Sequence, residues 1–88
     1  MTVKQLIKEA GYEEVIIFNN PSYDSAFIGV TTKDIAVYDY DKMIEWHIEN
    51  DGMSYEEAED FIQWNDSFYY GEGYPIIIRN LDYLKNTE

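Results

Sequence analysis

The sequence predicts an α+β domain, in which helices pack on one face of a small and mostly antiparallel sheet. Apolar residues recur at helical spacing in three segments, and four short runs of β-prone residues lie between or after them. Two of the helical segments are adjacent in the sequence, so strands and helices do not simply alternate. We therefore expect the order αβββααβ rather than the alternating units of a parallel sheet.

A short helix opens the chain. Thr2 and Gln5 form a T-x-x-Q capping box, in which each side chain satisfies a backbone N–H of the first turn. Gly11 suits the end of this helix, because glycine adopts the left-handed conformation at low cost. The apolar residues of the segment fall on one face: Val3, Leu6, Ile7 and Ala10.

Three strands are expected next. The run 15–18 is continuous and β-prone, is followed by Asn-Asn-Pro, and fits a strand covered on both faces. The runs 26–30 and 35–38 flank a short polar connector and predict a β-hairpin. Gly29, inside the first of these two runs, indicates a bulge or close packing by a helix.

Two capped helices follow the hairpin. Asp39 or Asp41 is expected to cap the first of them, and Trp46 lies off its apolar stripe. That stripe has the spacing of an amphipathic helix and consists of Tyr40, Met43, Ile44, His47 and Ile48. Ser54 and Glu57 form the capping box of the second helix. Its inner face is predicted to contain Ala58, Phe61, Ile62 and Asn65.

An aromatic loop over residues 64–74 leads to the last strand. Pro75 can begin a strand without removing a donor from the ladder, and Ile76–Ile78 is predicted to be a buried strand. A polar tail begins at about residue 80. We expect residues 1–88 to form a single domain, since the length suits one small domain and a hydrophobic fraction of 45% is enough for a core.

Composition excludes several kinds of site. The chain has no cysteine, which excludes disulfides, thiolate zinc sites and cysteine nucleophiles. Its single histidine, His47, lies on an apolar stripe and is expected to be packed or hydrogen bonded rather than catalytic. The acids at positions 39, 41 and 45 lack the glycine and the bidentate glutamate of a calcium loop. We expect neither a metal nor another cofactor.

The net charge of −12 bears on the class of partner. Direct binding of nucleic acid is disfavoured, because phosphate contacts need lysine and arginine, and anionic membrane surfaces are disfavoured for the same reason. No run reaches the roughly 20 apolar residues of a membrane span, and the first residues lack the apolar region of a signal peptide. A cytoplasmic protein is therefore expected.

Most of the charge lies between Asp39 and Asp66, where ten acids accompany one base, Lys42. The candidate partner-binding acids are Glu45, Glu49, Glu56, Glu59 and Asp60. One interpretation is a solvated face that keeps the protein soluble. The other is an acidic surface that meets a basic patch on a partner, such as the nucleic-acid channel of a nuclease.

Five candidate aromatic residues gather in the loop, interleaved with glycines: Trp64, Phe68, Tyr69, Tyr70 and Tyr74. Small domains use such residues in the core. Aromatics that alternate with glycines in a loop cannot all face inward, however, and tyrosine and tryptophan are common anchors of protein interfaces. The loop has no lysine or arginine to hold phosphate, so a protein partner is favoured over stacked bases.

Within the stretch 23–62, three strings carry a resemblance: Tyr-Asp-Ser-Ala with Ile-Gly-Val in 23–30, Val-Tyr-Asp-Tyr-Asp-Lys-Met in 37–43, and Asp-Gly-Met-Ser with Glu-Glu-Ala in 51–58. The stretch resembles small, acidic, uncharacterised proteins of Gram-positive bacteria and their phages. The resemblance implies host-directed binding, including inhibition of CRISPR or restriction nucleases. The aromatic loop departs from the proline-containing segment of that group, which implies a different partner if the loop is the recognition surface.

These features together predict a non-enzymatic protein-binding module. We expect a phage-associated inhibitor that engages a host nucleic-acid-binding protein or nuclease, with a basic surface, through acidic helices and aromatic anchors. The alternative is a homo-oligomeric regulatory or assembly protein that associates through its exposed aromatics. A third class, an enzyme that uses clustered carboxylates, would need a deep pocket with two carboxylates close together.

Overall fold

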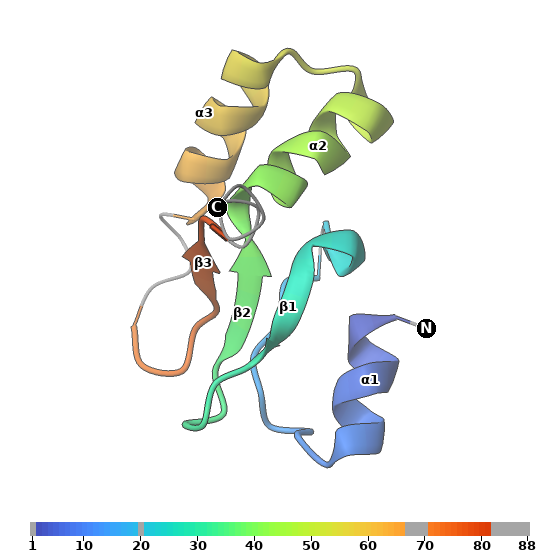
Figure 1. Cartoon of the computed structure of the whole chain (residues 1–88), viewed down its shortest axis with the longest axis vertical. Helices are drawn as coiled ribbons and strands as arrows, with labels where there is room; N and C mark the ends of the chain where they lie inside the picture. Colours follow the sequence, from blue (N-terminus) through green and yellow to red (C-terminus); the bar gives the residue numbers. More distant parts are fainter. Residues whose placement is uncertain (1, 20, 67–70, 82–88) are drawn as a thin grey trace, which may run out of the picture.

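The fold is α+β with a mixed three-stranded sheet, as the computed structural model shows for residues 2–19, 21–66 and 71–81 (Figure 1). In chain order the elements are α1 (Val3–Ala10), the 3-10 helix η1 (Asp24–Ala26), β1 (Phe27–Val30), β2 (Ala36–Asp39), α2 (Tyr40–Asp51), α3 (Tyr55–Asp66) and β3 (Ile76–Ile78). The predicted fold class is confirmed. The predicted polar tail lies, from residue 82 on, outside the described residues.

Strand β2 lies at the centre of the sheet, between β1 and β3. β1 and β2 form the predicted hairpin and run antiparallel, with Phe27 opposite Tyr38. β3 runs parallel to β2, with Ile77 opposite Tyr38. The expectation of a mostly antiparallel sheet is therefore only partly right. Because α2 and α3 lie between these two strands in the sequence, they return the chain to the end where β2 starts, as a parallel pair requires.

The run 15–18 forms no strand among the described residues, so the predicted order αβββααβ becomes αββααβ. Phe18 is nonetheless buried, and its backbone N–H donates to Tyr38 Oη at 3.2 Å instead of to a neighbouring strand. Burial raises the pKa of Tyr38 to about 12, which keeps this phenol neutral. A hydrogen bond to a side chain far along the sequence thus replaces the ladder bond that a strand would have made.

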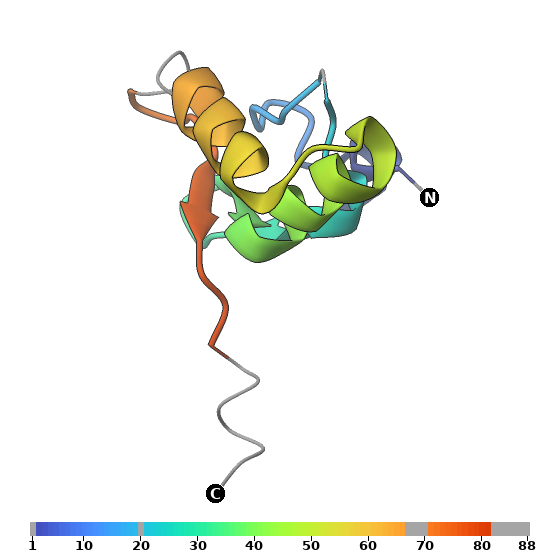
Figure 2. The same ribbon diagram turned by 90° about the horizontal axis from the view of Figure 1, so that it is seen from above.

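The helices do not form one layer over the sheet, in contrast to our expectation. α2 continues directly from β2, and α2 and α3 lie together beyond the end of the sheet, whereas α1 lies beside β1 (Figures 1 and 2). α2 also packs against η1. Of the apolar face predicted for α1, Val3 and Ile7 are buried, but Leu6 and Ala10 are exposed. The stable packing of α1 therefore depends on a narrower face than the sequence suggests.

Aromatic rings build much of the core. Phe18 packs against Tyr38 with its ring centroid 4.7 Å away and against Tyr23 at 5.6 Å, both edge-on. Trp46 extends this cluster toward α2, with its ring 5.7 Å from that of Tyr23. Edge-to-face contacts of this kind are favourable, and large rings give a short chain much buried area from few residues. Smaller residues complete the cluster: Ala26, Ala36, Met43, Ile44, Ala58 and Ile62.

The predicted capping boxes are both confirmed. In α1, the Gln5 N–H donates to Thr2 Oγ1 at 3.2 Å, and Gln5 Oε1 accepts from the Thr2 N–H at 2.9 Å. Ser54 and Glu57 make the same reciprocal pair before α3, at 3.2 Å for each bond. Gly11 ends α1 in the left-handed conformation, with φ of 86°.

Two alternatives that the sequence left open are decided. Asp39 rather than Asp41 caps α2, because its carboxylate accepts from the Lys42 N–H at 3.2 Å. At Gly29 the pairing of β1 with β2 shifts register between Phe27 and Gly29, which is the signature of a bulge. For the cap, the sequence left the position open between two residues; for Gly29, it gave the position and left the cause open.

Apolar side chains of α2 and β3 that we expected to be buried are also exposed. Ile48 on α2 is 40% exposed, while Trp46, which lies off the predicted stripe, is half-buried in the aromatic cluster. On β3, Ile76 and Ile78 are 41% and 39% exposed, so the strand prediction is confirmed and the prediction of its burial is wrong. β3 is covered on the face of Ile77 only, since successive side chains of a strand point to opposite faces.

Candidate functional site

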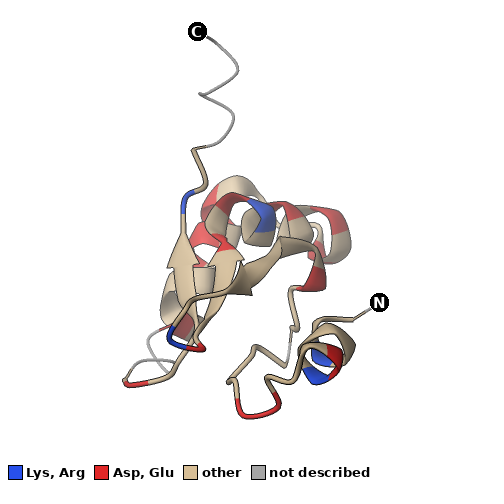
Figure 3. Cartoon of the chain, turned by 60° about the horizontal axis from the view of Figure 1, so that its bottom comes forward, with Lys and Arg blue, Asp and Glu red and all other residues tan. Residues whose placement is uncertain are grey.

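The acidic residues of α2 and α3 lie largely on the surface, and Figure 3 shows them spread over both helices while the strands carry few charges. Four of the five candidate acids are exposed: Glu45, Glu49, Glu56 and Asp60. They form an i, i+4 pair on each helix, and like charges at this spacing repel by about 0.2–0.5 kcal/mol. This repulsion would be relieved by a basic partner.

Glu45 and Glu49 line a shallow depression at the side of α2 that faces η1. The depression has a volume of about 250 Å³ and is also lined by Ser25, Lys42 and Trp46. Lys42 is the one base of the sequence between Asp39 and Asp66, so a cation of the chain itself already lies at this end of the acidic surface.

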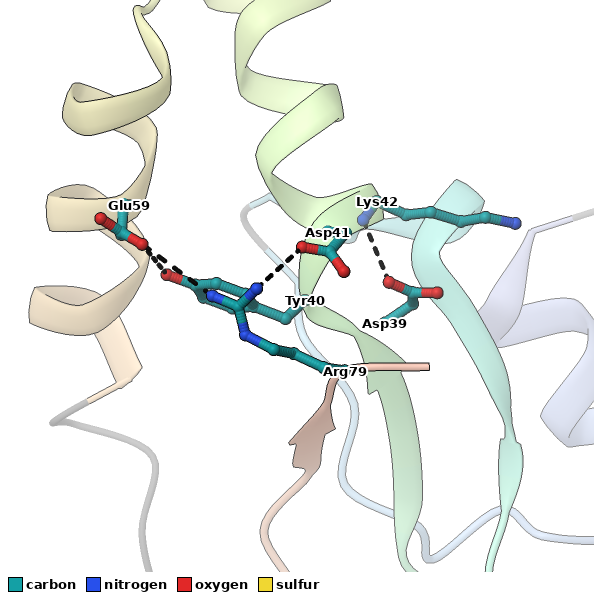
Figure 4. A network of polar contacts seen from close by, with 6 residues as sticks. All are labelled: Asp39, Tyr40, Asp41, Lys42, Glu59 and Arg79. Atoms are coloured by element: carbon teal, nitrogen blue, oxygen red, sulfur yellow. Dashed lines mark hydrogen bonds and ion pairs between the residues drawn. The ribbon is translucent and has the colours of Figure 1, made fainter. Parts of the chain in front are cut away.

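Glu59 is separated from the other candidate acids, because it takes part in a network around Arg79 (Figure 4). The guanidinium of Arg79 lies over the Tyr40 ring, with its carbon 4.7 Å from the ring centroid. Its Nη1 is 3.4 Å from Asp41 Oδ1, and its Nη2 is 4.0 Å from Glu59 Oε2. The Tyr40 hydroxyl donates to the same Glu59 oxygen at 3.3 Å. Arg79 thus bridges the end of β3 to the first turn of α2 and the middle of α3.

The pKa values of Arg79 and Tyr40 are both raised in this network. A hydrogen bond with Tyr55 raises the pKa of Arg79, and the nearby Asp41 carboxylate acts in the same direction. Burial raises the pKa of Tyr40, although a hydrogen bond with Gln63 opposes the shift. The site therefore consists of a permanently charged guanidinium, a neutral phenol and two carboxylates.

Sequence reasoning missed Arg79, Tyr40, Asp41 and Tyr55 as members of a site. One signal was present, because Arg79 is the only arginine of the chain and directly follows the last strand. Its contacts could not be inferred, since they depend on the parallel register of β3 against β2.

The aromatic candidates fall into two groups. Trp64 is 63% exposed on α3, and Tyr74 is exposed before β3. Phe68, Tyr69 and Tyr70 lie outside the described residues, so their role as anchors stays a prediction. Trp64 and Tyr55 are large exposed rings on the helix that also carries Glu56 and Asp60.

His47 is a buried, doubly hydrogen-bonded residue, as we expected. Its Nε2 is 2.7 Å from Tyr23 Oη, and its Nδ1 is 2.8 Å from Asp51 Oδ2. In the neutral ring, Nδ1–H donates to the carboxylate and Nε2 accepts from the phenol. A carboxylate, an imidazole and a hydroxyl in sequence resemble a nucleophilic triad in composition, but Tyr23 is only 1% exposed. A substrate cannot reach this hydroxyl, so the chain of contacts is structural.

A second acidic depression, of about 450 Å³, lies away from α2 and α3 and is lined by Glu13, Glu14 and Asp34 among others. Within the ranges that the structure describes, no group of three or more histidine and acidic side chains could hold a metal ion. In the same ranges, no helix is both long and apolar enough to cross a membrane.

Comparison of the chain with known proteins finds no matching family model, no matching curated protein and no matching solved structure. The resemblance of residues 23–62 stays a prediction. Function is therefore inferred from the side chains and their geometry.

Proposed function

We propose that this protein is a non-enzymatic, cytoplasmic and phage-associated inhibitor, which binds the basic surface of a host nucleic-acid-binding protein or nuclease. The observation that carries the proposal is the surface of α2 and α3, which combines four exposed carboxylates with the exposed Trp64. The phage setting and the class of target rest on the resemblance of residues 23–62.

Charge and aromatic side chains would contribute in different ways. Complementary potentials steer two proteins together and raise the association rate, with only a modest effect on affinity. A basic nucleic-acid channel is complementary to a helical pair whose sequence, from Asp39 to Asp66, has ten acids and one base. Tryptophan and tyrosine are enriched among the residues that dominate binding energy, so Trp64 and Tyr55 supply the short-range contacts.

The burial of Tyr23 and His47 supports a binding role over a catalytic one. General acid–base catalysis needs a titratable group within hydrogen-bond reach of a substrate. Here the imidazole and the phenol are each 1% exposed and satisfy each other. The contact between Tyr23 and His47 thus holds the start of η1 against α2.

The test is a charge reversal with a matched control. The binding variant changes the four exposed helical acids to lysine: Glu45, Glu49, Glu56 and Asp60. The control variant makes the same charge change at exposed acids outside these helices: Glu9, Glu13, Glu14 and Glu72. Host proteins retained by the immobilised wild-type protein are identified by mass spectrometry, and their binding kinetics are measured against all three proteins.

We expect the retained target to be a nuclease or another nucleic-acid-binding protein whose activity the wild-type protein inhibits. The target should associate far more slowly with the binding variant than with the control variant. Added salt should also slow its association with the wild-type protein. Circular dichroism reports whether each variant folds. Equal binding by the two variants would mean that the helical acids only keep the protein soluble, and the proposal would be abandoned.

A second candidate function, homo-oligomeric assembly, is favoured by the uncovered face of the sheet. Ile76 and Ile78 lie on the face opposite the buried Tyr38, as the register and the alternation of side chains show. Val37 shares this face, and Ile28 at the bulge is 45% exposed. The charged strand residue of this face, Asp39, is buried and caps α2, so two copies of a protein with a net charge of −12 can meet here with their acidic helices apart.

Light scattering over a concentration series separates the two functions. A dimer that dissociates on Ile78→Thr, but not on Ile16→Thr at an exposed position outside the sheet, supports assembly through this face. A monomer at all concentrations removes the second candidate and leaves the first.

A further inference from the structure

Arg79 shows how the seam between α2 and α3 holds a guanidinium group. Its planar cation lies over the Tyr40 ring at 4.7 Å, with Asp41 on α2 and Glu59 on α3 on its two sides (Figure 4). Tyr55, exposed on α3, also raises the pKa of Arg79. An aromatic platform with carboxylates placed beside it is the arrangement that attracts a planar cation in general.

The seam is open to solvent and its present contacts are weak. The Arg79 side chain is 56% exposed, and those of Asp41 and Glu59 are 46% and 32% exposed. The nitrogen–oxygen distances of 3.4 and 4.0 Å are longer than the 2.7–2.9 Å or so of a strong charge-assisted hydrogen bond. Each carboxylate meets a different nitrogen, so neither forms the bidentate pair that makes arginine–carboxylate contacts strong.

We propose that the seam of Tyr40, Asp41, Tyr55 and Glu59 is a binding site for an arginine side chain of a protein partner, and that Arg79 is its internal competitor. The proposal rests on the proposed function, because it names the chemical group of the partner that the acidic helices recognise. An incoming arginine replaces Arg79 over Tyr40 and can pair bidentately with a carboxylate.

Lysine is a poorer occupant of this seam. Its ammonium is a compact and strongly hydrated charge, whereas guanidinium is planar, less strongly hydrated and able to stack on a ring. The site therefore distinguishes arginine from lysine, which the scattered acids of the helical surface do not. Net charge alone predicts no such preference.

The test uses hexa-arginine and hexa-lysine peptides as probes, with binding followed by NMR shifts of the backbone amides of α2, which every variant retains. Arg79→Gln removes the competitor and should tighten hexa-arginine binding about tenfold, because an exposed ion pair and an exposed cation–π contact no longer have to be broken. Lys33→Gln, at an exposed position in the β1–β2 connector, makes the same charge change and is the control. It should leave hexa-arginine binding nearly unchanged.

The platform is tested in the Arg79→Gln background. Tyr40→Phe keeps the ring and should keep the preference for hexa-arginine over hexa-lysine, whereas Tyr40→Leu removes the ring and should abolish it. If Arg79→Gln fails to fold by circular dichroism, Arg79→Lys keeps the charge, weakens the competitor and should give part of the gain.

Two results would overturn the site. One is an equal gain for both peptides on Arg79→Gln, which would show a general effect of charge. The other is no gain with Arg79→Gln or, if that variant does not fold, with Arg79→Lys, which would make Arg79 a purely structural residue. Neither result would contradict the proposed function. That proposal is tested separately, by the charge reversal of Glu45, Glu49, Glu56 and Asp60.

Discussion

Replacing Tyr23 by phenylalanine should destabilise the fold by a predictable amount. The substitution removes one hydroxyl and keeps the ring, so the edge-on contacts with Phe18 and Trp46 remain. It deletes the 2.7 Å hydrogen bond to His47 Nε2. Since both residues are 1% exposed, water cannot take the place of the lost hydroxyl, and the imidazole nitrogen is left without this partner.

The expected loss is about 1–3 kcal/mol, the cost of leaving a buried polar group unsatisfied. A chain of 88 residues has a free energy of unfolding of roughly 4–13 kcal/mol at the usual value per residue. The substitution would therefore remove a substantial part of the stability. At about 4–8 °C per kcal/mol for a domain of this size, the thermal midpoint should fall by several degrees or more.

Urea unfolding, followed by tryptophan fluorescence, measures the effect, because the Trp46 ring packs against Tyr23 and His47. Tyr12→Phe, at an exposed position, is the control and should change stability by less than about 0.5 kcal/mol. In a His47→Leu background the loss of the Tyr23 hydroxyl should cost less, since its partner is gone. An equal cost in both backgrounds, or a Tyr23→Phe variant as stable as the wild type, would refute the reasoning.

Three further predictions concern stability. Ser54→Ala should cost about 0.5–2 kcal/mol in urea melts, because the cap of α3 is lost, whereas Glu56→Gln in the same turn should cost little; equal costs would place the start of α3 elsewhere. Burial raises the pKa of Asp66, so its ionised form is disfavoured in the fold. Asp66→Asn should therefore raise the thermal midpoint at pH 7 more than Asp60→Asn does. This difference between the two variants should vanish below the ordinary pKa of 3.8, where the Asp66 carboxyl is protonated in both folded and unfolded chains. The midpoint of the wild-type protein should also rise from low salt to ~0.15 M, where the Debye length is near 8 Å and the helical acids are screened; a flat or falling midpoint would show that the fold already compensates them.

The parts of the fold that could be predicted are those that depend on near neighbours in the sequence. Both capping boxes join residues three positions apart, and their hydrogen bonds were correctly expected. The hairpin joins two runs with a short connector between them. In each case the partners are close along the chain, so tertiary structure has little influence on the pairing.

The failures arise where a distant residue decides the outcome. The run 15–18 has the composition of a strand, but the N–H of Phe18 bonds to the Tyr38 side chain, a partner twenty positions away. The run Ile76–Ile78 is a strand, yet it pairs parallel to β2 and exposes two of its side chains. Hydrophobic runs indicate a strand without stating its partner or how many of its faces are covered.

The candidate site shows the same division. Composition alone located the acids on the helical pair, but it could not separate Glu59 from Glu56 and Asp60. That separation follows from Arg79, whose position depends on the register of β3. The pairing of a single arginine with an aromatic ring and two acids on different helices leaves no periodic signal in the sequence.

The acidic surface has two parts that differ in what they require of a partner. The exposed carboxylates of α2 and α3 act at a distance, so they favour encounter with any basic surface. The Tyr40 seam acts only on contact, and its occupant must displace Arg79 and stack on a ring. A lysine-rich surface meets the first requirement but not the second, because ammonium lacks the planar shape of guanidinium. Under the proposed function, selectivity among basic proteins would therefore come from the seam, while the large net charge would mainly set how often such proteins are met.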